Sequence, residues 1–72
     1  MINGLTKQQA YESMEQGKYI THWYFSKDEY LWMDGSDNIR DEKGYYWKQK
    51  DWDDRSGGNW ENGWSIWKGY KL

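Results

Sequence analysis

The chain has 72 residues and a mass of 8.9 kDa, which allows one small domain and excludes a cleft between two domains. Ten Lys and Arg against twelve Asp and Glu give a net charge of −2, so the basic footprint of a nucleic-acid-binding protein is missing. Cysteine is absent, which excludes disulfides and cysteine metal sites. No apolar run reaches the ~20 residues of a membrane span. We therefore expect residues 1–72 to form a single cytoplasmic domain that binds neither nucleic acid nor a membrane.

Aromatic residues are expected to form the core. The sequence contains four Ile, three Leu and no Val, whereas seven Trp, seven Tyr and one Phe make up 21% of the chain. Each such ring can bury about 150–250 Å². Fifteen rings cannot all be buried in a chain of this length, so some must lie on the surface as a binding face or as an interface between copies. A homo-oligomer is expected for this reason.

The first predicted element is a helix over residues 7–16. Thr6 and Gln9 have the spacing of a capping box, and Gly17 follows the last residue of the helical pattern. A narrow apolar stripe on this helix includes Met14. Because so short a helix is marginally stable alone in water, we expect Met14 to pack against a sheet.

The remaining residues, 18–70, predict an antiparallel meander of about four or five strands. Short runs of aromatic and β-branched residues alternate with turn-forming residues. Gly44 closes a turn that starts at Asp41, so it is expected at positive φ in a type I turn followed by a bulge. The polar stretch 51–63 is expected to be a long loop. The fold class is therefore α+β, with one N-terminal helix packed on strands at residues 18–25, 30–33, 38–40, 45–47 and 64–67.

The inventory of reactive side chains argues against catalysis. His22 is the only histidine and the chain has no cysteine, so a nucleophilic catalytic site has few residues to draw on. No second ligand stands at metal-binding spacing from His22, and residues 34–38 do not match a calcium loop. We expect no enzyme activity, no metal and no cofactor. His22 itself is either a strand histidine bonded to a neighbour or a ligand contact.

Hydrogen-bonding groups alternate with flat rings in residues 22–30, a mixture that suits a planar, polar ligand. A nucleobase gains about 1–3 kcal/mol from each aromatic stack, and a carboxylate accepts hydrogen bonds from an exocyclic amine or from ribose hydroxyls. Neighbouring strand residues point to opposite faces, so one of the rings at 23 and 24 is expected in the core. The predicted ligand-binding residues are His22, Trp23, Tyr24, Glu29 and Tyr30.

The helix followed by the segments 15–18, 20–23 and 29–32 resembles the Thoeris anti-defence nucleotide-sponge family, which is encoded by phages. The resemblance covers roughly residues 5–32, and residues 61–64 show a weaker similarity. His22 stands where these proteins more often carry Arg. The resemblance implies a compact α+β chain that binds cyclic ADP-ribose-type signals, silences a bacterial immune pathway and forms oligomers with pockets between subunits.

These observations predict a non-enzymatic phage accessory protein that binds and sequesters a nucleotide-type immune signal in the host cytoplasm. One alternative is an inhibitor that binds a host defence protein through an exposed aromatic and acidic surface of the C-terminal half. Another is a small carbohydrate-binding module, with sugars stacked on Trp52, Trp60 and Trp64.

Overall fold

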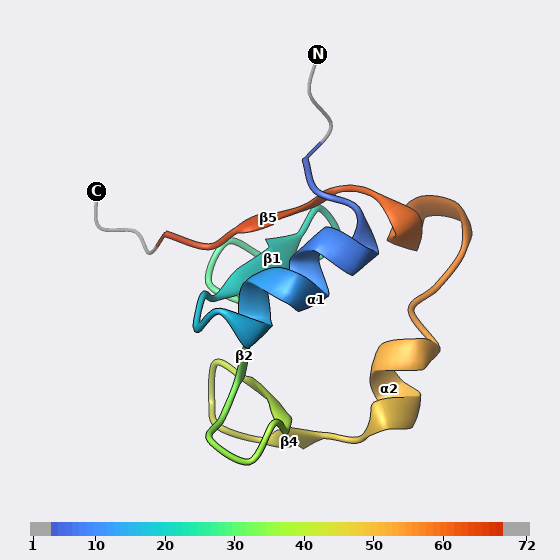
Figure 1. The fold of residues 1–72 in the computed structure, drawn as a ribbon. Coiled ribbons are helices and arrows are strands. Elements are labelled where there is room, and N and C mark those ends of the chain that lie inside the picture. Colours follow the sequence, from blue (N-terminus) through green and yellow to red (C-terminus); the bar gives the residue numbers. More distant parts are fainter. Residues whose placement is uncertain (1–3, 69–72) are drawn as a thin grey trace.

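The computed structural model describes residues 4–68. Helix α1 (Lys7–Glu15) packs against a five-stranded antiparallel sheet, so the predicted α+β class is confirmed (Figure 1). Positions 69 and 70 of the predicted sheet region lie outside the described residues. In chain order the strands are β1 (Ile20–His22), β2 (Leu31–Met33), β3 (Ile39–Asp41), β4 (Tyr46–Trp47) and β5 (Trp64–Ile66).

The strand order β4-β3-β2-β1-β5 places the last two strands at opposite edges of the sheet. Strands β1 to β4 form the predicted meander, and β5 pairs with β1 through Ile20↔Ile66 and His22↔Trp64. The chain between β4 and β5 must therefore pass from one edge to the other. It carries helix α2 (Gln49–Asp53) and the 3₁₀ helix η1 (Gly58–Glu61) along this path (Figure 1).

Helix α1 begins and ends as the sequence predicts. The side chain of Thr6 accepts a hydrogen bond from the Gln9 amide, and the Gln9 side chain accepts one from the Thr6 amide, which completes the capping box. Gly17 follows the helix at φ +89°, a conformation that a residue without Cβ adopts at no steric cost. Met14 is buried, which confirms the predicted docking of this helix.

The hairpin between β3 and β4 also has the predicted turn. The Gly44 amide donates to the Asp41 carbonyl at 2.9 Å, and the Asp41 amide donates to the Tyr45 carbonyl at 3.0 Å. Gly44 has φ +85°. The Asp41 carboxylate accepts from the amides of Lys43 and Tyr45, so this side chain stabilises the turn from inside.

Two predicted segments are wrong, while the bounds of the other elements lie within one residue of those predicted. The strand expected over residues 18–25 ends at His22, because the Phe25 amide turns back to the His22 carbonyl at 2.9 Å. The stretch 51–63 is not a plain loop, since it contains most of α2 and all of η1. Trp52 anchors α2 to the core: its ring lies 5.1 Å from that of Trp64 and 5.8 Å from that of Tyr11.

Aromatic rings occupy both faces of the sheet. On the face that α1 covers, five aliphatic side chains are buried together with the rings of Trp52 and Trp64. The expectation that aromatic residues form the core is therefore wrong in part, because most of the described rings are only partly buried or exposed. On the opposite face, Tyr19 and Tyr30 stack with centroids 4.8 Å apart, and Trp67 lies 4.2 Å from Tyr30. The expected surplus of surface rings is therefore present. Within residues 4–68, no helix has the length and apolar character needed to cross a bilayer.

Candidate functional site

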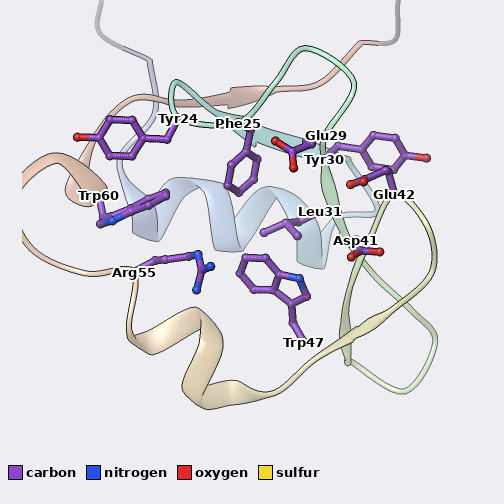
Figure 2. A pocket seen from close by; sticks show the side chains of 10 residues that line it. All are labelled: Tyr24, Phe25, Glu29, Tyr30, Leu31, Asp41, Glu42, Trp47, Arg55 and Trp60. Carbon is purple, nitrogen blue, oxygen red and sulfur yellow. The ribbon is translucent and has the colours of Figure 1, made fainter.

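A pocket of about 360 Å³ lies where the chain crosses from β4 to β5 (Figure 2). Its volume falls within the roughly 300–1,000 Å³ typical of small-molecule sites. The lining comes from β2, β3 and β4, from the turns that follow β1 and β3, and from the crossing segment. It consists of Tyr24, Phe25, Glu29, Tyr30, Leu31, Asp41, Glu42, Trp47, Arg55 and Trp60.

The walls of this pocket are aromatic. Phe25, Trp47 and Trp60 surround the space that opens above the buried Leu31 (Figure 2). The ring of Tyr24 meets Trp60 edge-on at 4.9 Å. A planar ring that entered the pocket would therefore find aromatic surfaces on several sides, which is the environment that stacking requires.

Arg55 is the one cation of the lining. Its guanidinium lies 4.4 Å from the Trp47 ring centroid and 5.8 Å from that of Trp60, both within cation–π range. Its Nη1 donates to the Asp51 carbonyl at 2.9 Å. Figure 2 shows the side chain extending into the space between the two indoles.

Three carboxylates lie on the opposite side of the pocket, at Glu29, Asp41 and Glu42 (Figure 2). The Glu29 carboxylate accepts from the Ser26 amide at 2.6 Å, and that of Asp41 accepts from the two turn amides described above. Each carboxylate has two oxygens and about four acceptor positions. Acceptor capacity therefore remains for a ligand that donates hydrogen bonds.

The structure brings together three of the five residues predicted to bind ligand. Tyr24, Glu29 and Tyr30 line the pocket, whereas His22 and Trp23 do not. The expectation that one of the rings at 23 and 24 is in the core is wrong, because Trp23 is 64% exposed and Tyr24 is 56% exposed. Both residues follow the end of β1, so the alternation of a strand does not apply to them.

His22 is a buried strand histidine, 3% exposed. Its Nδ1 accepts from the Tyr24 amide at 3.1 Å, so the neutral ring carries its proton on Nε2. This Nε2–H faces the carbonyls of Asn62 at 2.8 Å and Asn59 at 3.1 Å. The imidazole also lies 4.3 Å from the Trp60 ring. His22 thus ties η1 to β1 and positions one wall of the pocket.

Seven lining residues are not among those predicted to bind ligand: Phe25, Leu31, Asp41, Glu42, Trp47, Arg55 and Trp60. The first two adjoin predicted residues in the sequence. The other five reach the pocket from β3 and from the chain between β3 and β5, a placement that local patterns do not show. The sequence did contain one indication of the role of Arg55, which stands between Trp52 and Trp60 in a polar stretch. Arginine packs favourably on indole faces, so this neighbourhood favours a cation–π contact. Trp60, one of the three tryptophans of the sugar-binding alternative, also lines the pocket.

The sugar-binding alternative loses two of its three proposed platforms. Trp52 is 5% exposed and Trp64 is fully buried. The Trp64 indole N–H also donates to the Trp60 carbonyl at 2.8 Å. These rings therefore belong to the core, and neither offers a face on which a sugar could stack.

Among residues 4–68, no three His, Asp or Glu side chains are grouped closely enough to hold a metal ion. No protein-family model, curated protein or solved structure matches this chain.

Proposed function

We propose that this protein is a non-enzymatic binding protein for a nucleotide-type small molecule, whose base enters the pocket between β2 and the crossing segment. The observation that carries the proposal is the composition of the lining: aromatic walls, one guanidinium and three carboxylates around about 360 Å³. Base–aromatic stacking supplies about 1–3 kcal/mol per ring. The carboxylates supply acceptors for an exocyclic amine or for ribose hydroxyls.

The residues that contact the ligand differ in part from those that the sequence suggests. Trp47 and Trp60 take the stacking role, with Phe25 beside them. Glu29 and Glu42 accept hydrogen bonds. All of these lie in one copy of the chain, so binding requires no second subunit.

The biological role that we propose is sequestration of a signal. A tight, non-catalytic pocket lowers the free concentration of its ligand, as the resemblance to anti-defence sponges over residues 5–32 implies for a bacterial immune messenger. We also propose self-association through exposed rings such as those of Tyr45 and Tyr46, which are 67% and 55% exposed. Light scattering that gives only the monomer mass at high concentration would reject that part.

Calorimetric titration tests the binding function directly. The panel contains nucleosides, nucleoside monophosphates, cyclic ADP-ribose isomers and cyclic di- and trinucleotides. We expect Trp60→Ala to weaken binding by roughly tenfold or more, through one lost stack. Trp23→Ala is the matched control, because it removes an exposed indole outside the pocket lining.

Absence of heat for every ligand would reject the proposed function. Co-purification of a host protein with the same sample would then favour the inhibitor alternative, for which the exposed Tyr45 and Tyr46 of the C-terminal half offer a surface.

A further inference from the structure

The pocket lining carries an excess of negative charge. Three carboxylates face a single guanidinium. Within residues 4–68, the two ion pairs join Arg40 to Asp34 and Lys50 to Asp54, so neither involves a carboxylate of the lining. A concave site with low-dielectric walls strengthens the field of its charges. The field here disfavours a ligand rich in phosphate and favours one with positive charge.

Arg55 shows which shape of cation this space accepts. Its planar guanidinium lies near two indoles, 4.4 Å from Trp47 and 5.8 Å from Trp60. Tryptophan is the strongest cation–π partner among the side chains. The residue follows the C-cap of the short helix α2, and its guanidinium donates to a backbone carbonyl of that same helix. A planar cation that took the place of this guanidinium would meet the same two indoles.

We infer that the pocket selects a nucleobase-like ligand whose planar ring is positively charged, such as an N-methylated purine nucleoside. The inference rests on the proposed binding function and adds the charge class of the ligand. It argues against the phosphate-bearing cyclic signals of the sponge family as the preferred ligands of this pocket. The cationic ring occupies the space between Trp47 and Trp60 in place of the Arg55 guanidinium. Its exocyclic amine donates to Glu42 or Glu29 on the opposite side, where the carboxylates also attract the charge.

Two nucleosides of nearly the same shape test the charge preference. The wild-type protein is titrated calorimetrically with 7-methylguanosine, whose methylated ring is cationic in slightly acidic buffer, and with guanosine, which is neutral. We expect 7-methylguanosine to bind about tenfold more tightly, the size of a partly desolvated cation–π contact. Guanosine 5′-monophosphate is expected to bind more weakly than guanosine.

Two variants locate the effect. Arg55→Met removes the competing guanidinium and is expected to tighten binding of 7-methylguanosine several-fold. Lys50→Met is the matched control, because it removes the same charge from an exposed position of α2 and should leave the affinity unchanged. Circular dichroism confirms that both variants are folded.

The outcomes separate the inference from the function on which it rests. Equal affinity for 7-methylguanosine and guanosine, or tighter binding of the monophosphate, overturns the charge inference and leaves the proposed function standing. Weaker binding of 7-methylguanosine to Arg55→Met than to Lys50→Met also overturns it, since Arg55 would then assist the ligand. If no nucleoside or nucleotide binds, the proposed function and the inference fall together.

Discussion

The hydrogen bonds of His22 provide the sharpest test of how the pocket wall is held in place. The substitution His22→Phe keeps a ring of similar size, so the contacts with Trp60 at 4.3 Å and Trp64 at 4.7 Å can persist. It removes both ring nitrogens. The Asn62 carbonyl then loses its N–H donor, and the Tyr24 amide loses its acceptor.

The expected loss of stability follows from these two bonds. A buried polar group left without a partner costs about 1–3 kcal/mol. Asn62 and Tyr24 are exposed residues, so water can replace part of what is lost. We therefore expect a decrease of about 2 kcal/mol in the free energy of unfolding, toward the lower end of the range for two groups.

Urea denaturation followed by tryptophan fluorescence measures this change. Thr21→Val serves as the control, because it lies on the same strand and its hydroxyl bonds to the Glu29 carbonyl near the surface. Its expected cost is about 0.5–1 kcal/mol. If His22→Phe is as stable as the wild type, the imidazole bonds contribute nothing and His22 does not hold η1 in place.

Three further perturbations test the fold. Met14→Asp is expected to cost about 2–5 kcal/mol, because it removes a buried side chain and places a carboxylate in the core; a melting temperature within a few degrees of the wild type would contradict the docking of α1. Gly44→Val is expected to weaken the hairpin by about 1–2 kcal/mol, because φ is +85° there and a β-branched residue is strained in this conformation. No atom lies within 4 Å of the added Cβ, so the cost comes from the backbone and not from a clash. An unchanged urea midpoint would contradict this. Arg40 donates a hydrogen bond to the Asp34 carboxylate and lowers its pKa to about 2, with help from the backbone amides of Asn38 and Ser36. A lowered pKa stabilises the fold above the ordinary carboxyl value of about 4, and this contribution is lost as the pH falls towards 2. Melting curves over this pH range should show a smaller slope for Asp34→Asn, and an identical slope would refute the assignment.

Much of the fold could be predicted where neighbouring residues carry the signal. Thr6 and Gln9 specify the start of α1, and Gly17 and Gly44 each mark a left-handed position. Such features depend on bonds between residues three or four apart in sequence. The end of β1 could not be predicted from strand propensity. The strand ends because the amides of Tyr24 and Phe25, in the turn that follows, donate to the side chain and the carbonyl of His22.

The candidate site was predictable only in part. Tyr24, Glu29 and Tyr30 are close in sequence, and they share the pocket as the pattern suggests. Trp47 joins them through the pairing of β4 with β3, opposite the buried Ile39. Arg55 joins them because β5 pairs with β1 rather than with β4, so the segment that carries Arg55 must cross from one edge of the sheet to the other. No local pattern states which edge of a sheet a distant strand will occupy.

The sequence by itself determined that some rings must stay at the surface, because the numbers of each residue type set the apolar area available. It did not determine how far rings replace aliphatic side chains in the core, since five of the seven buried hydrophobic residues among positions 4–68 are not aromatic. Nor did it determine which rings take which role. Trp52 and Trp64 are buried while Trp23 is exposed, although Trp23 stands in an aromatic run and Trp52 in a charged, polar stretch. Only the tertiary structure decided between them, since burial depends on what the crossing segment and α1 place against each ring.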